Sequence, residues 1–187
     1  MTHRLGKLLV ISGPSGVGKS TIARALEDRL DAKLSISMTT RPKSNTDREG
    51  VDYHFVDHDR FEQAIENDEL LEWERVFDHY YGTPRNMVLE SLNRGEDVIL
   101  EIDVNGGVAV FEKMPDAIMI FILPPTHDEL LNRLRSRKRE SEERIQRRFA
   151  EAKREIAQAK TSGAYKHFLI NDDLESTISD AAKLALR

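Results

Sequence analysis

Residues 13–20 read Gly-Pro-Ser-Gly-Val-Gly-Lys-Ser, and this segment constrains the fold more than any other part of the chain. It has the pattern G-x-x-x-x-G-K-[S/T], in which glycines let the backbone turn so that its N–H groups face an anion. An apolar run typical of a buried parallel strand precedes it at 7–12, and apolar residues at helical spacing follow at 21–30. This order predicts a phosphate-binding loop at the positive end of a helix. A glycine-rich turn without a nucleotide is the alternative, and the position between strand and helix argues against it.

The loop offers three kinds of group to a nucleoside triphosphate. Its backbone amides surround the phosphates, Lys19 reaches the β- and γ-phosphates, and the Ser20 hydroxyl is a ligand for Mg²⁺. Mg²⁺ is therefore the expected cofactor. The residues predicted to bind the phosphoryl donor here are Gly13, Pro14, Ser15, Gly16, Val17, Gly18, Lys19, Ser20 and Thr21.

The rest of the chain alternates between strand-like and helix-like segments, with a charged, turn-rich loop at 41–52. Strands are expected at 34–39, 53–56, 97–102, 118–123 and 167–170, with short strands within 70–81. Helices are expected at 59–67, 84–92, 126–135, 141–158 and 174–186. The alternation predicts a three-layer α/β fold, a parallel sheet with helices on both faces. The segment from about 35 to 88 breaks the rhythm and indicates an inserted, partly antiparallel lobe.

Composition excludes several classes of protein. The net charge of −5 gives no electrostatic basis for broad binding to nucleic acid or to an anionic membrane. The absence of cysteine removes disulfides, thiol nucleophiles and thiolate metal sites. Residues 1–6 are too short and polar for a signal peptide, and no apolar run approaches membrane-spanning length. We therefore expect a cytoplasmic protein.

Other features narrow the choice among proteins with such a loop. The chain has no Asn-Lys-x-Asp tetrapeptide, which argues against a GTPase, and it is too short for most motor ATPases. The inserted lobe and an arginine-rich stretch at 133–154 favour a kinase with a lobe for its acceptor and a lid over its donor.

Several motifs carry a family resemblance. In chain order they are Ser37-Met-Thr-Thr-Arg41, Glu49-Gly-Val-Asp-Tyr53, Leu71-Glu72-Trp73, Tyr80-Tyr81-Gly82-Thr83, Glu101-Ile-Asp103, Arg133, Arg137, Arg148 and Asn171-Asp-Asp173. With the phosphate-binding loop they resemble guanylate kinase over essentially the whole chain. The resemblance implies a core at 1–34 and 89–187, a helical lid at about 126–150 and a GMP-binding lobe at 35–88. It also implies that ATP is the phosphoryl donor and that GMP and dGMP are the acceptors.

The resemblance implies a GMP site in the lobe. A carboxylate at Glu72 accepts both the N1–H and the amino group of guanine, a pair that adenine cannot donate. Ser37 and Thr83 would supply further base contacts, and Arg41, Tyr53 and Tyr81 would bind the acceptor's phosphate. The alternatives are that Glu72 is an ordinary surface carboxylate and that the tyrosines only pack the lobe's core.

The chain departs from the family pattern at one phosphate contact. The family usually has a second phosphate-binding arginine three residues after the first, and this chain has Ser44 there. Lys43 and Arg48 flank that position, and we expect one of them to take over the contact.

The remaining predicted site residues follow the second buried strand or lie in the lid. Glu101 and Asp103 are assigned to metal and acceptor positioning without a division of roles, with Ser20 and Asp103 as the predicted metal ligands. Arg133, Arg137 and Arg148 would close over the donor triphosphate, Arg148 also reaching GMP, and Asn171 would lie beside the donor's adenine. The predicted catalytic residues are Lys19, Arg41, Arg137 and Arg148.

Two competing functions stay open at this point. One is a kinase of the same fold with another acceptor, such as dAMP or a ribosyl phosphate. The other is a guanylate-kinase-like protein-binding module, although such modules have typically lost loop residues that this chain retains. The expected partners are the small-molecule substrates alone, in a monomer or small homo-oligomer.

Overall fold

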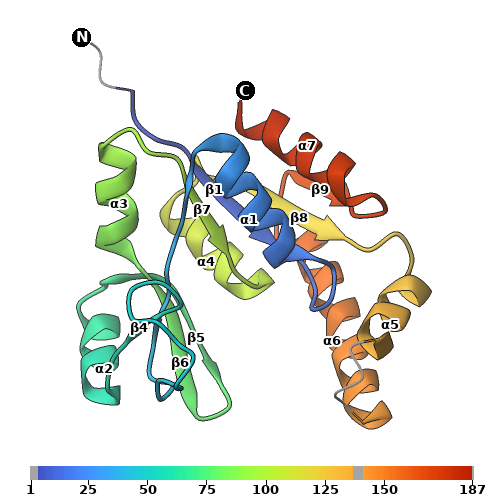
Figure 1. Ribbon diagram of the computed structural model, residues 1–187, viewed down its shortest axis with the longest axis horizontal. Helices are drawn as coiled ribbons and strands as arrows, with labels where there is room; N and C mark the ends of the chain where they lie inside the picture. Colours follow the sequence, from blue (N-terminus) through green and yellow to red (C-terminus); the bar gives the residue numbers. More distant parts are fainter. Residues whose placement is uncertain (1–3, 137–140, 187) are drawn as a thin grey trace.

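The computed structural model describes residues 4–136 and 141–186, which form two β-sheets with helices around them (Figure 1). The larger sheet has five strands, all parallel, in the order β2-β7-β1-β8-β9. Their bounds are β1 Leu8–Ser12, β2 Lys33–Leu34, β7 Val98–Glu101, β8 Ile118–Leu123 and β9 His167–Ile170. This arrangement confirms the predicted parallel sheet.

Alternation along β1 explains why the large sheet is covered on both faces. All five residues of β1 are buried, and successive side chains point to opposite faces. Leu9 and Ile11 pack with helices α1 (Lys19–Leu30) and α7 (Leu174–Ala185). Leu8 and Val10 pack on the other side, with α4 (Val104–Lys113) and α6 (Glu142–Thr161). The result is the expected three-layer α/β fold.

The smaller sheet is mixed and has a core of its own. Its order is β4-β3-β6-β5, with β3 parallel to β4 and antiparallel to β6. The bounds are β3 Met38–Thr39, β4 His54–Phe55, β5 Leu70–Val76 and β6 His79–Pro84. Helix α2 (His58–Glu66) covers it with Phe61 and Ala64, and α3 (Arg85–Asn93) leads back to the large sheet. On the opposite side of the molecule in Figure 1, α5 (His127–Ser136) packs against α6.

Two expectations about secondary structure were wrong. The run at 34–39 is not one strand: Leu34 pairs with β7 in the large sheet, whereas Met38 pairs with β4 and β6 in the small one. The chain crosses between the sheets here because the lobe is inserted after β2. The sequence reading also placed no helix between the second and third buried strands, where α4 lies. Gly106 and Gly107 lower the helix propensity of this segment, and tertiary packing overrides it.

Candidate active site

The phosphate-binding loop joins β1 to α1 and lines a cavity of about 250 Å³ with Glu101. Gly18 precedes the helix with φ of 102°, a conformation that L side chains rarely adopt. A Cβ at Gly18 would also lie 2.8 Å from Nδ2 of Asn171. The Lys19 Nζ donates to the carbonyl oxygens of Gly13, at 2.6 Å, and Pro14, at 3.2 Å. The loop therefore has the backbone shape and the cation that its sequence predicts.

The two carboxylates after β7 contact different neighbours. The Ser20 hydroxyl donates to Oε1 of Glu101 at 2.5 Å. Asp103 instead caps α4, because its Oδ1 accepts from the amide of Gly106 at 2.7 Å. Of the two predicted metal ligands, Ser20 contacts Glu101 and Asp103 contacts the first turn of α4. A hydroxyl beside a carboxylate is an oxygen set that suits Mg²⁺.

Glu72 is a buried carboxylate rather than a surface one. Its side chain lies on β5 with 8% exposure, and Oε1 accepts from the Thr83 hydroxyl at 2.5 Å. Burial raises the pKa of Glu72 to about 7, and the negative charge of Asp103 adds to the rise. A Cβ at Gly106 would lie 3.0 Å from Oε2 of Glu72 and 3.2 Å from Oδ1 of Asp103. Glycine at that position leaves the two carboxyl groups facing a common space.

Arg41 lies on the lobe, over the rings of Tyr53 and Phe55, with its Cζ 5.3 Å and 5.6 Å from their centroids. Its Nη1 donates to Oδ2 of Asp47 at 3.0 Å, and this contact raises the pKa of Arg41 and holds that of Asp47 well below its usual range. The Tyr53 and Tyr81 rings are 5.8 Å apart, edge to face, and burial raises the pKa of Tyr53. Three predicted phosphate-binding residues are thus brought together.

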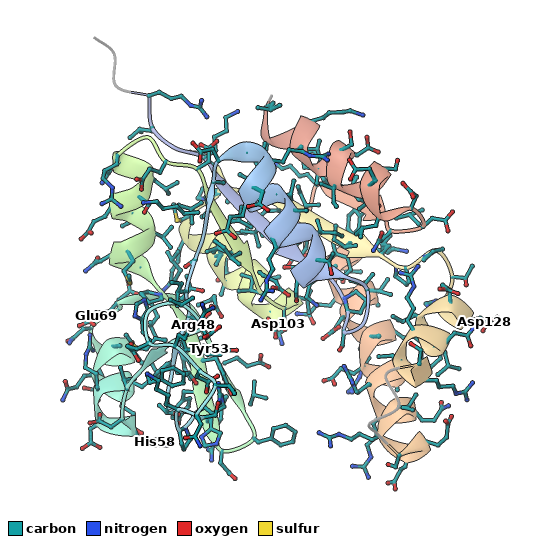
Figure 2. All side chains as sticks on the ribbon, viewed as in Figure 1. Arg48, Tyr53, His58, Glu69, Asp103 and Asp128 are labelled. Atoms are coloured by element: carbon teal, nitrogen blue, oxygen red, sulfur yellow. The ribbon has the colours of Figure 1, made fainter. Side chains whose placement is uncertain are left out.

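Figure 2 shows how these groups are divided between the two parts of the molecule. Tyr53 lies in the lobe, and Asp103 lies on the side of the core toward it. Ser37 is at the crossing between the sheets, where its carbonyl oxygen accepts from the amide of His54 at 2.9 Å.

The lid residues contact the phosphate-binding loop or its surroundings. Arg148 on α6 donates to the Ser15 hydroxyl. Arg133 on α5 donates to Glu129 at 3.0 Å and to the carbonyl of Asn171 at 3.1 Å. The Asn171 side chain is buried and donates to the carbonyl of Val17 at 2.8 Å. Arg137 lies outside the described residues.

Among the groups near the site that sequence reasoning missed are a carboxylate on α6 and a tyrosine that follows this helix. Glu155 on α6 is partly buried, and burial raises its pKa to about 7 against the attraction of Lys19. Tyr165 donates to the Ser12 hydroxyl at 2.9 Å, and burial raises its pKa to about 12. No local sequence pattern marks either residue as part of the site. Glu155 is one of several carboxylates on a charged helix, and Tyr165 lies far from Ser12 in the sequence.

Comparison with known proteins gives one consistent family. The family model described as guanylate kinase matches residues 5–185. Guanylate kinase from Caldanaerobacter subterraneus subsp. tengcongensis is 48% identical over 92% of this chain and 83% of the relative. The enzyme from Myxococcus xanthus is 47% identical over 94% of this chain and 83% of the relative. A crystal structure of guanylate kinase from Anaplasma phagocytophilum superposes with a TM-score of 0.75, at 31% identity over 100% of this chain and 87% of that one.

Proposed function

The chain belongs to the guanylate kinase family and is a nucleoside monophosphate kinase, and we propose that it transfers the γ-phosphate of ATP, bound with Mg²⁺, to GMP and dGMP. The products are ADP and GDP or dGDP, and the enzyme would serve purine nucleotide metabolism in the cytoplasm. No helix within the described residues is long and apolar enough to cross a bilayer. The enzyme would act as a monomer or a small homo-oligomer.

The observation that carries the choice of acceptor is the buried Glu72 beside Thr83 and Asp103. A carboxylate in this position accepts two N–H groups from the edge of guanine. Adenine offers no such pair, so AMP would leave a buried carboxylate unmatched, at a cost of about 1–3 kcal/mol. The lobe at 35–88 would hold GMP, with Ser37 and Thr83 at the base and Arg41, Tyr53 and Tyr81 at the phosphate.

Contacts within the site support a division between Glu101 and Asp103. Ser20 and Glu101 would hold Mg²⁺, because the hydroxyl and carboxylate oxygens are already adjacent, 2.5 Å apart. Asp103 would face the guanine together with Glu72, since its own carboxylate points toward Gly106. The metal, when bound, neutralises charge that develops on the β- and γ-phosphates.

The residues present perform the transfer by positioning and by neutralising charge. An oxygen of the GMP phosphate forms the new bond to the γ-phosphorus while the bond to the bridging oxygen of ADP breaks. That acceptor oxygen is anionic near neutral pH, so no general base is needed. Lys19, Arg133, Arg137 and Arg148 would surround the transferring phosphate when the lid at about 126–150 closes and excludes water. Asn171 supports this by holding the loop at Val17.

Release of ADP from Mg·ATP, with GMP, dGMP, AMP, CMP and UMP offered separately, tests the proposal. Turnover with GMP and dGMP is expected, and the Lys19→Ala protein prepared in parallel shows how much activity a contaminating kinase contributes. Turnover with AMP or another base instead would overturn the assignment of the lobe. No turnover with any acceptor would favour the protein-binding alternative.

A further inference from the structure

The loop at 41–53 carries three cations and two aspartates, and their pairing decides which positive charges remain for an acceptor. The cations are Arg41, Lys43 and Arg48, the aspartates are Asp47 and Asp52, and a third carboxylate, Glu49, accepts from the amide of Phe55 at 3.3 Å. Asp47 accepts from Arg41 and also from the amide of Ser44, at 2.7 Å. One negative charge therefore already offsets Arg41. A phosphate monoester near pH 7 has between one and two negative charges, so Arg41 alone leaves it undercompensated.

Arg48 is committed elsewhere. Its backbone amide donates to Oδ2 of Asp52 at 2.8 Å, and its Nε donates to the same oxygen at 3.3 Å. The side chain is 70% exposed. The closed contact between the amide, the guanidinium and one carboxylate makes Arg48 part of the turn.

Lys43 lies next to Arg41 on the same aromatic cluster. The Nζ of Lys43 is 5.9 Å from the centroid of the Phe55 ring, and Cζ of Arg41 is 5.6 Å from that centroid. The Phe55 ring in turn packs edge to face on Tyr53, 5.8 Å away. Among residues 4–136 and 141–186, no ion pair engages Lys43. A cation over a ring face is weakly held, and its flexible four-carbon stem lets the ammonium move to a stronger anion.

We propose that Lys43 is the second cation that binds the phosphate of the acceptor nucleotide, together with Arg41. This inference rests on the proposed function, because it assumes that the lobe holds a nucleoside monophosphate. Position 44 is a serine whose amide faces Asp47, so Lys43 supplies from the neighbouring position the charge that the serine lacks.

Binding of GMP and of guanosine to the intact protein, measured by calorimetry, separates this role from others. Lys43→Ala is expected to weaken GMP binding about tenfold, the effect of one charge-assisted contact, and to leave guanosine binding unchanged. Lys43→Arg retains the charge and should bind GMP within about twofold of the wild type. Arg48→Ala is the matched control, with one cation of the same loop removed, and GMP binding should change by less than about twofold.

The outcomes are distinct from those of the proposed function. If the wild type phosphorylates GMP and Lys43→Ala binds GMP normally, the inference about Lys43 is wrong while the proposed function stands. Equal weakening of GMP and guanosine would show that Lys43 supports the lobe rather than the phosphate. A wild type that binds no GMP would overturn both.

Discussion

The Thr83 hydroxyl and the Glu72 carboxylate form a buried hydrogen bond of 2.5 Å that joins the two strands of the β5–β6 hairpin. The bond fixes one carboxylate oxygen and leaves the other facing the first turn of α4. Under the proposed function, Glu72 would be held in place before the guanine arrives, so little ordering of this side chain would remain on binding.

Replacing Glu72 by glutamine should lower kcat/KM for GMP by about 10²-fold or more, because an amide cannot accept both N–H groups of the guanine edge. The protein should remain folded, since the change removes a buried charge and keeps the shape of the side chain. Steady-state kinetics with GMP, accompanied by a thermal melt, measure both effects. Glu62→Gln, an exposed carboxylate on α2, is the matched control. An unaltered kcat/KM in Glu72→Gln would exclude this residue as the base reader.

The raised pKa of Glu72 predicts a pH dependence with a definite sign. Guanosine binding, which involves no phosphate titration, should strengthen as pH rises through about 7 and Glu72 ionises. The contribution of Glu72 to the free energy of unfolding should instead decrease as pH rises. The folded state binds the proton more tightly than the unfolded state, so the contribution of Glu72 is full below about 4.5 and is lost as pH rises to about 7. Each pH unit in that window costs roughly 1.4 kcal/mol.

Urea titrations of the wild type and of Glu72→Gln between pH 4.5 and 8 check the stability half of this prediction. The variant should gain stability relative to the wild type as pH increases and then level off. Parallel curves for the two proteins would mean that another group, such as Glu155, dominates the titration.

Glu101→Gln and Asp103→Asn should affect different ligands. The first weakens an oxygen ligand beside Ser20, so we expect the Mg²⁺ concentration for half-maximal activity to rise several-fold with KM for GMP little changed. The second should raise KM for GMP and leave the Mg²⁺ requirement near that of the wild type. Activity measured over a matrix of Mg²⁺ and GMP concentrations separates these effects. The opposite pattern would identify Asp103 as the metal ligand.

Gly107→Ala should destabilise the core by about 1–3 kcal/mol. A Cβ there would lie 1.8 Å from Oη of Tyr165, closer than any real contact, and Tyr165 would lose its bond to Ser12. Tyr165→Phe alone should cost about 1 kcal/mol, the worth of a hydrogen bond. In the double variant the two costs should be less than additive, because removing Oη relieves the shortest contact and leaves Cζ, at 2.8 Å, as the nearest atom. Urea denaturation of the wild type, the two single variants and the double variant completes this double-mutant cycle. Strictly additive losses of stability would contradict the close contact between Gly107 and Tyr165.

The sequence predicted the elements whose pattern is local. The apolar run at 118–123 coincides with β8, and the helix expected at 141–158 is α6, which Ser141 caps through its hydroxyl. The loop at 13–20 could be predicted because each residue type has its own function in phosphate binding: glycine lets the backbone turn, lysine supplies the charge and serine the hydroxyl. Helix α4 was missed because its glycines lower the helix propensity of the segment. Gly107 is needed there because Tyr165, a residue distant in the sequence, leaves no room for a Cβ.

In the candidate site, too, the residue types could be predicted from local motifs, whereas their contacts depend on residues distant in the sequence. The residue types at Glu72 and Arg41 could be read from motifs, but their surroundings could not. Burial of Glu72 depends on Thr83 and α4, and the pairing of Arg41 depends on how the following loop folds back to Asp47. The choice between Lys43 and Arg48 likewise required the contact of Arg48 with Asp52.

The strand order of the large sheet bears on how the chain is made. β1 leaves the ribosome well before its two neighbours in the sheet, β7 and β8, which are translated much later. Until then both edges of β1 lack their permanent partners, which is the condition that invites mispairing with another chain. The lobe between them is contiguous and has its own core, so we expect it to fold first on the nascent chain. The binding lobe would then be complete before the catalytic sheet closes.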